Sequence, residues 1–260
     1  LHLSLRRQRQ MCIRDSTTSE LPSATTGSYI HTVDYGDVVL PVYVHGTGQN
    51  VIAVFHGAVD RAKMRLPIFS MLRTLKEIEN STLLLFSDPT LDLDAGMRLS
   101  WYLGTGRVNM HHEMARLIAL HSQRVDAKRV VLAGSSGGGY AALQTSSYLP
   151  DSRVVVGSPQ IILGNYFPST VERTYEVAAG THVPNEEWKR RIDAVTAFES
   201  VDFARDVFYL QNKGDTHHVQ RHFKPFVDAY KKSENAERLR VITTDQGAGH
   251  HAAKPEQIRH

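Results

Sequence analysis

The chain has very little cysteine. Its 260 residues include one, Cys12, which lies near the amino end. The part that we expect to fold, which begins after residue 27, therefore has none. Disulfide frameworks, cysteine metal sites and cysteine nucleophiles are excluded for that part, while the cellular compartment is not decided.

Long hydrophobic runs are also lacking. Hydrophobic residues make up 41% of the chain and charged residues 22%, which is ordinary for a globular protein. No apolar run approaches the roughly 18 residues that a membrane-spanning helix requires. The length suits a single α/β domain with a sizeable core. Without a visible signal peptide or membrane span we favour the cytoplasm as an expectation, and the compartment stays open because the native start is uncertain.

The chain carries little excess charge outside its first residues. The formal net charge is +3, but residues 1–16 hold four arginines (Arg6, Arg7, Arg9, Arg14) against Asp15. Removing these from the totals of 30 basic and 27 acidic residues leaves 26 of each. A nucleic-acid-binding domain needs a basic surface, so we expect no nucleic-acid partner.

Residues 1–27 do not look like part of the domain. They begin without Met and show no helix or strand period that continues into the rest of the chain. Residues 8–16 resemble translated sequencing-adapter read-through, and the alternatives are a disordered basic arm or the remnant of a targeting sequence. We predict a disordered, non-native lead-in over 1–27 and a single domain over 28–260.

What the chain does contain is a Gly-x-Ser-x-Gly turn. An apolar run, Val130 to Ala133, leads directly into Gly134-Ser135-Ser136-Gly137-Gly138, and a helix-forming segment follows. This is the strand–turn–helix context of a nucleophile elbow, in which glycines permit a tight turn and the serine hydroxyl stands above the sheet. We predict Ser136 as the nucleophile, with Ser135 as the alternative. The N–H of Gly137 is the first expected oxyanion donor. No Lys follows the glycines, so a phosphate-binding loop is disfavoured.

Strand-like and helix-like segments alternate along the chain. Expected strands cover 29–33, 38–45, 50–55, 83–86, 130–133, 153–156, 206–210 and 238–243, and the longer expected helices cover 66–80, 108–124 and 219–232. This alternation predicts an α/β fold with a mainly parallel sheet and helices on both faces. Residues 161–200 break the alternation, and we expect them to form an inserted cap. Such sheets bind ligands beyond the carboxyl ends of their strands.

Three of those carboxyl ends carry candidate site residues. Gly57 follows one strand and is the second expected oxyanion donor, with a simple strand-exit turn as the alternative. Asp215 follows another; it suits an acid that orients an imidazole, or a helix N-cap. His250 and His251 follow the last strand, and we prefer His250 as the general base because Gly249 precedes it. The order Ser136, Asp215, His250 is the Ser…Asp…His order of one hydrolase fold.

Other residues near these ends are weaker candidates. His56, Trp101 and Tyr102 are predicted to contact substrate, and packing in the core is the alternative for the aromatic pair. The chain has three adjacent histidine pairs: His111-His112, His217-His218 and His250-His251. Neighbouring helix positions diverge by about 100°, and no His-Glu-x-x-His occurs, so we predict no catalytic metal. We predict no cofactor either.

These motifs together resemble the α/β-hydrolase superfamily over about residues 28–255. Within it, residues 55–58, 100–102 and 135–140 resemble a bacterial branch often associated with cell-surface glycans, which is similar to the hydrolase-like protein of the accessory Sec pathway. The superfamily usually closes with a helix after the histidine. Residues 255–260 barely start one, so we expect a truncated carboxyl end.

The resemblance implies a serine hydrolase that cleaves a carboxylic ester through an acyl-enzyme intermediate. Ser136 attacks the ester, His250 moves the proton, Asp215 orients His250, and the oxyanion lies against Gly57 and Gly137. The expected substrate is a small-molecule or glycan-linked acyl ester. The alternatives are an acyltransferase acting on glycan hydroxyls and a non-catalytic partner in a glycan or secretion assembly. The substrate and the oligomeric state stay open.

Overall fold

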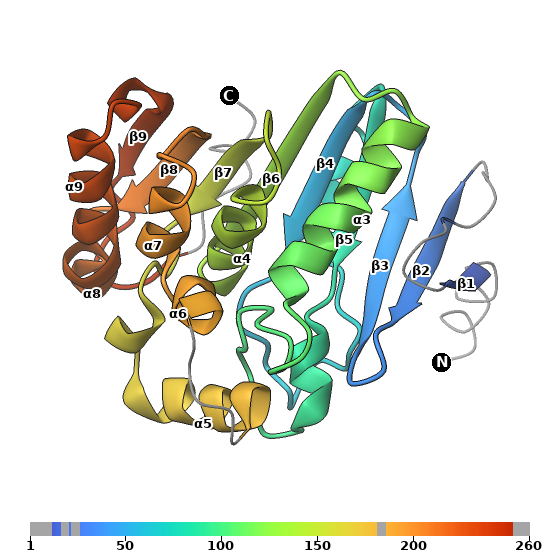
Figure 1. Ribbon diagram of the computed structural model, residues 1–260, viewed down its shortest axis with the longest axis horizontal. Helices are drawn as coiled ribbons and strands as arrows, with labels where there is room; N and C mark the ends of the chain where they lie inside the picture. Colours follow the sequence, from blue (N-terminus) through green and yellow to red (C-terminus); the bar gives the residue numbers. More distant parts are fainter. Residues whose placement is uncertain (1–11, 17–20, 22–26, 181–185, 252–260) are drawn as a thin grey trace.

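The sheet at the centre of the molecule has nine strands in the order β1-β2-β3-β5-β4-β6-β7-β8-β9. The computed structural model describes residues 12–16, 21, 27–180 and 186–251 (Figure 1). The strands are β1 (Cys12–Ser16), β2 (Ser28–Asp34), β3 (Val39–His45), β4 (Asn50–Phe55), β5 (Ser81–Phe86), β6 (Arg129–Ser135), β7 (Arg153–Gly157), β8 (Asp206–Asn212) and β9 (Leu239–Thr244).

Six neighbouring strands, β5-β4-β6-β7-β8-β9, run parallel to one another. The hairpin partner strand β3 is antiparallel to both β2 and β5. The predicted α/β class with a mainly parallel sheet is confirmed. Because the six strands end at the same edge, the segments that follow them are brought together there.

The described helices lie mainly on one face of this sheet (Figure 1). The helices are α2 (Leu72–Leu75), α3 (Met110–Arg124), α4 (Gly137–Ser146), α5 (Pro168–Ala179), α6 (Glu186–Ile192), α7 (Ala194–Glu199), α8 (Thr216–His218) and α9 (Lys224–Lys232), with a π-helical turn over Val219–Phe223 between the last two. Helices α3 and α4 pack on one face, and the main core lies between them and the sheet (Figure 1). Helix α2 contributes Leu75 to a second core cluster with residues of β4 and β5.

Two segments differ from the sequence-based prediction. The helix expected over 66–80 is wrong in extent, since only α2 forms there. Its N-cap residue Met71 has a φ of 64°, so the chain before it is not helical. Within the expected lead-in, Cys12–Ser16 form β1, which pairs parallel with the open edge of β2. The domain boundaries otherwise stay a prediction, and the expected cap segment contains α5, α6 and α7.

The turn between β6 and α4 depends on close backbone packing. A Cβ on Gly138 would lie 2.1 Å from the Phe55 carbonyl oxygen, and one on Gly134 would lie 2.3 Å from the Gly138 carbonyl carbon. Both distances are far below van der Waals contact, and the opposing atoms belong to the backbone. The glycines therefore allow α4 to begin directly against the ends of β4 and β6.

We expect Gly138→Ala to lower the free energy of unfolding by about 3 kcal/mol, the upper end of the usual cost of overpacking. Gly164→Ala is the matched control, since a Cβ there meets nothing within 4 Å. Its unfolding free energy should stay within about 0.5 kcal/mol of the wild-type value. Urea unfolding followed by circular dichroism measures both. Equal midpoints for the two variants would contradict the packing argument.

Two buried histidines lie against each other between β2 and α3. The rings of His31 and His121 are 5.8 Å apart in an edge-to-face arrangement, and both side chains are buried. Burial, together with Arg124, lowers the pKa of His31 from 6.5 to about 4. Burial, then the His31 and Arg124 charges, lowers the pKa of His121 to about 3. Both rings are therefore neutral in the native protein at neutral pH.

This pair predicts a loss of stability in mild acid. Below pH 6.5 these two histidines bind protons in the unfolded chain but not in the folded chain. The free energy of unfolding is therefore highest above pH 6.5 and falls as the pH approaches 4. Each group contributes a slope of at most about 1.4 kcal/mol per pH unit. His121→Leu should flatten the pH dependence of the unfolding free energy between pH 6.5 and 4.5. Gln123→Leu, at an exposed and non-titratable position on the same helix, should leave the dependence unchanged.

Candidate active site

The serine of the Gly-x-Ser-x-Gly turn has a strained backbone. Ser136 has φ 55° and ψ −123°, a combination that side-chain-bearing residues rarely adopt. Its N–H donates to the Gly157 carbonyl at 2.9 Å, and its carbonyl accepts from the Tyr140 N–H at 3.0 Å. The adjacent Ser135 donates its hydroxyl to the same Gly157 carbonyl. The hydroxyl of Ser136, not that of Ser135, contacts the polar cluster described next.

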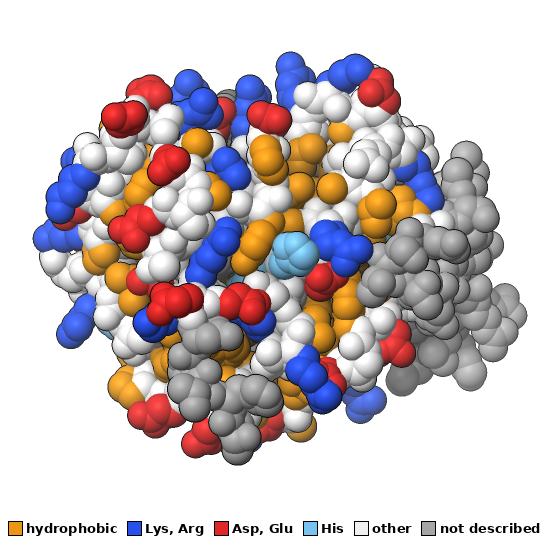
Figure 2. Space-filling model, in the orientation of Figure 1, with side chains coloured by type: hydrophobic (Ala, Val, Ile, Leu, Met, Phe, Trp, Pro, Cys, Tyr) orange, Lys and Arg blue, Asp and Glu red, His pale blue; other side chains and the backbone are white. Residues whose placement is uncertain are grey.

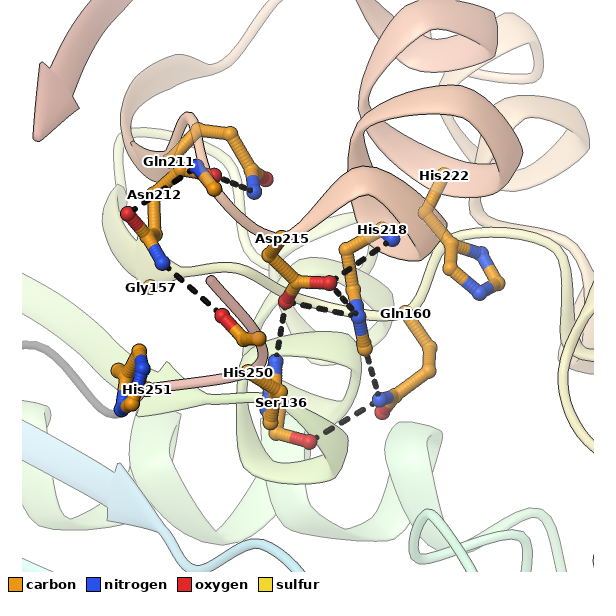
Figure 3. Close-up of polar contacts among 12 residues, drawn as sticks. Ser136, Gly157, Gln160, Gln211, Asn212, Asp215, His218, His222, His250 and His251 are labelled. Carbon is orange, nitrogen blue, oxygen red and sulfur yellow. Dashed lines mark hydrogen bonds and ion pairs between the residues drawn. The ribbon is translucent and has the colours of Figure 1, made fainter. Parts of the chain in front are cut away.

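The predicted acid and base are in direct contact. His250 Nδ1 lies 2.6 Å from Asp215 Oδ2, although the two residues are separated by 35 positions (Figure 3). Asp215 also accepts from the His218 N–H as the N-cap of α8, so the N-cap alternative and the contact with an imidazole are both present. The alternative base His251 instead contacts the Ala248 carbonyl through Nε2.

A second imidazole shares the same carboxylate. His218 Nδ1 lies 3.1 Å from Asp215 Oδ1, and its ring stacks on the His250 ring with centroids 4.1 Å apart and planes 17° apart. His218 is buried, while the His250 side chain is 35% exposed. In the sequence, His218 stands out only as a member of a histidine pair, and no motif there indicated that it would lie in the site.

A buried glutamine joins the serine to this cluster. Gln160 Nε2 donates to Ser136 Oγ at 3.0 Å and lies 2.9 Å from His218 Nε2 (Figure 3). Its Oε1 accepts from Trp101 Nε1 at 3.2 Å. The structure thus places Ser136, Asp215 and His250 in one continuous polar cluster, through Gln160 and His218. Gln160 follows β7 by three residues, so its position after a parallel strand was the only signal in the sequence.

The hydrogen bonds around Asp215 determine the charges in the cluster. Burial acts to raise the pKa of Asp215, but bonds from His250 and His218 outweigh it and hold that pKa below the usual value. Burial, then the nearby His250, lowers the pKa of His218 to about 4. Asp215 is therefore an anion and His218 is neutral at pH 7. An anionic acceptor requires a proton on Nδ1 of each ring, so Nε2 is the ring nitrogen of His250 that remains for another partner.

Asn212 fixes the loop that carries His250. Its Nδ2 donates to the carbonyls of Gly247 and Gly249 at 3.0 and 2.9 Å, and its Oδ1 accepts from the Gln246 N–H. A Cβ on Gly214 would lie 2.0 Å from the Gly247 carbonyl oxygen. The loops after β8 and β9 are therefore in close contact. Their contact brings Asp215 to His250.

The two predicted oxyanion donors lie on neighbouring backbone segments. A Cβ on Gly57 would lie 3.6 Å from Ser136 Cβ and 3.8 Å from the Gly137 nitrogen. His56 Nε2 accepts from the Asp88 N–H at 3.0 Å, so its Nδ1 carries the proton that reaches the Gly57 carbonyl at 2.8 Å. The side chain of His56 is buried and fixes the Gly57 loop from within. The oxyanion role of both glycines stays a prediction.

Trp101 and Tyr102 are fully buried. Both have positive φ angles, 53° and 56°, and the buried carboxylate of Asp88 holds this turn by accepting from the Ser100 hydroxyl and the Tyr102 N–H, each at 2.8 Å. The Tyr102 hydroxyl accepts from the His56 N–H and donates to the Phe86 carbonyl. This arrangement favours the packing alternative. The predicted substrate contacts of His56, Trp101 and Tyr102 have no support from it.

One group of described residues can present metal-ligand atoms to a common point. Asp215, His218 and His250 each offer one such atom, all within 4.8 Å of one another. Both Nδ1 atoms lie at hydrogen-bond distance from the Asp215 carboxylate, that of His250 at 2.6 Å and that of His218 at 3.1 Å. Hydrogen bonds account for the arrangement, and the absence of a catalytic metal stays a prediction.

The surroundings of the cluster add two observations. A cavity of about 270 Å³ lies behind the turn, lined by Gly57 and Ser135 but not by Ser136, Asp215 or His250, so we do not count it as the reaction site. On the face shown in Figure 2, basic and acidic side chains are interspersed without a dominant patch of one sign. None of the helices in the described ranges combines the length and the apolar character needed to cross a bilayer.

Searches of protein-family profiles and of curated proteins find no match to this chain. Solved structures do match. The capsule O-acetyltransferase of Neisseria meningitidis serogroup A superposes with a TM-score of 0.62 at 16% identity, over 89% of this chain and 92% of that one. An S-formylglutathione hydrolase from Agrobacterium tumefaciens gives 0.58 at 17% identity, over 91% and 92%. An esterase from Pyrococcus furiosus gives 0.54 at 15% identity, over 92% and 90%.

These three proteins share the α/β-hydrolase fold. At such low identity the likeness concerns the fold alone. Together with the strand order and the Ser136 turn, it shows that this chain has the α/β-hydrolase fold.

Proposed function

We propose that the protein is a serine enzyme of acyl transfer and that its basic reaction is hydrolysis of a carboxylic ester. The single observation that supports this most strongly is the hydrogen-bonded cluster at the carboxyl edge of the sheet, in which Gln160 and His218 link Ser136 to the Asp215–His250 pair. The residues come from three separate segments. A nucleophile, a base and an orienting acid in this order are the parts that acyl transfer requires.

In the first half-reaction, Ser136 Oγ attacks the ester carbonyl carbon while His250 Nε2 accepts the hydroxyl proton. Asp215 holds Nδ1 of His250 and stabilises the imidazolium that forms. The backbone N–H groups of Gly57 and Gly137 lie toward the carbonyl oxygen as it becomes an oxyanion. His250 then protonates the leaving alcohol, and an acyl-serine ester remains.

In the second half-reaction, His250 Nε2 accepts a proton from water, and the water oxygen attacks the acyl carbon. The bond from carbon to Ser136 Oγ breaks, and His250 returns its proton to Oγ. A carboxylic acid leaves. If a sugar hydroxyl replaces water in this step, the same residues carry out acyl transfer. The similar solved structures include both hydrolases and an O-acetyltransferase. Experiment must therefore decide whether the acyl group passes to water or to a sugar hydroxyl.

Ser136→Ala should lower kcat for p-nitrophenyl esters by about 10⁶-fold, the loss that follows removal of the nucleophile in a serine protease. An acyl-chain-length series from acetate to octanoate measures this and ranks the acyl groups. A fluorophosphonate probe should label the wild type and not the variant. Labelling without ester turnover would indicate a transferase that needs its acceptor. No labelling of folded wild-type protein would refute the proposal and favour a non-catalytic role.

His250→Asn should reduce kcat/KM by at least about 10³-fold, because the base and its proton transfer are lost. His251→Asn is the matched control. It alters the adjacent histidine, whose ring contacts only the Ala248 carbonyl among the interactions of the described residues, and we expect less than a twofold change. The kinetics of both variants on one ester give the comparison. A greater loss in His251→Asn would mean that the base was assigned to the wrong residue.

A further inference from the structure

We propose that Gln160 is a further catalytic residue, which donates a hydrogen bond to the reacting oxygen of Ser136, and that His218 is the residue that positions it. The inference rests on the proposed function. It gives a role to the buried side chains of Gln160 and His218, which the three-residue mechanism does not use. Gln160 is entirely buried, and both ends of its amide are engaged.

The orientation of the Gln160 amide follows from its neighbours. Trp101 Nε1 can only donate, so the amide atom that faces it must be the oxygen. The amide nitrogen then faces Ser136 Oγ and His218 Nε2 and has one N–H for each. A flipped amide would set two donors against each other at Trp101. Ser136 Oγ is therefore an acceptor in this bond, and its own hydrogen remains for His250.

The protonation state of His218 is fixed in the same way. Its Nε2 accepts from Gln160, and its Nδ1 donates to Asp215. A neutral ring with the proton on Nδ1 satisfies both contacts. His218 thus links the carboxylate that orients the base to the amide that contacts the nucleophile. Moving any one of the three groups displaces the others.

The bond from Gln160 matters most when Ser136 Oγ carries negative charge. During deacylation the carbon–Oγ bond breaks, its electron pair goes to Oγ, and the His250 proton arrives there. The ester oxygen of an acyl-serine is a weak acceptor, whereas the departing oxygen is a strong one, so the Gln160 bond strengthens along this step. In acylation the bond already exists to the hydroxyl and weakens as the ester forms. Gln160 should therefore accelerate deacylation more than acylation.

Gln160→Met tests this, because it keeps the approximate volume and removes the donor. Rapid mixing with a p-nitrophenyl ester separates the acylation burst from steady turnover. We expect deacylation to slow by about 10- to 100-fold, the usual effect of one bond to a charged group, and acylation to slow less. Gln144→Met is the control: this buried glutamine on α4 bonds to Tyr140 and the Arg190 carbonyl, outside the cluster. It should keep the wild-type ratio of the two rates.

Gln160→Glu gives a second readout if the methionine variant folds poorly. An ionised carboxylate at this position has no hydrogen to donate, whereas a protonated one has a single O–H. The deacylation rate of this variant, relative to wild type, should therefore rise as the pH falls. A residue that only fills space would not produce this inverse dependence.

His218→Phe tests the positioning role, since it keeps the ring that stacks on His250 and removes both nitrogens. Asp215 then loses one donor and attracts the His250 imidazolium more strongly, so the acid limb of kcat/KM should move to higher pH. The other titratable groups facing this cluster, His217, His222 and Tyr166, are unchanged in the variant. Deacylation should slow as it does in the Gln160 variants.

The outcomes separate this inference from the proposed function. Wild-type protein that neither turns over esters nor reacts with the fluorophosphonate refutes both. Wild-type turnover with an unchanged ratio of deacylation to acylation in folded Gln160→Met refutes the role of Gln160 alone. An unchanged ratio of deacylation to acylation in folded His218→Phe refutes the positioning role of His218, and an unmoved acid limb refutes its effect on Asp215. In each of the last two cases the Ser136–His250–Asp215 mechanism still stands.

Discussion

The backbone turn at Ser136 is the constraint on which the rest of the site depends. A serine with φ 55° persists only where its surroundings hold it, and here the carbonyl of Gly157 and the N–H of Tyr140 do so. Glycines at 134 and 138 allow the start of α4 to lie against the end of β4 at distances no Cβ permits. The turn therefore sets where the hydroxyl stands. The loops that follow β7, β8 and β9 supply the side chains around it.

The cluster around that hydroxyl has one buried anion and two imidazoles, which stack on each other. Asp215 accepts from both rings, and each ring is held in the tautomer with its proton on Nδ1. The two rings differ in what their outer nitrogens meet. His218 Nε2 faces the Gln160 amide inside the protein, whereas His250 is partly exposed. This difference supports the roles proposed for the two rings: the exposed ring as the base that exchanges protons with substrate and water, and the buried ring as the one that holds its neighbours in place.

The sequence could predict the sheet and the approach of three separated segments at its edge, because both follow from periodicity and strand ends. Parallel strands end at one edge, so Ser136, Asp215 and His250 were expected to meet without any knowledge of side-chain packing. Gln160 and Asn212 could not be recognised in this way, since an amide side chain carries no motif and its role depends on which donors surround it. The helix expected over 66–80 failed for a related reason: the left-handed Met71 is set by tertiary packing, which overrides local propensity.

The charge balance of the cluster explains why the second imidazole has to be buried. Two cationic rings 4.1 Å apart would repel each other when His250 takes its proton, and Asp215 could not neutralise both. Burial lowers the pKa of His218 to about 4, so over the range in which esters are stable the ring stays neutral. A neutral ring can donate to Asp215 and accept from Gln160 at once, which a cation cannot. The desolvation that would be a cost elsewhere thus keeps His218 uncharged beside the ring that we propose as the base.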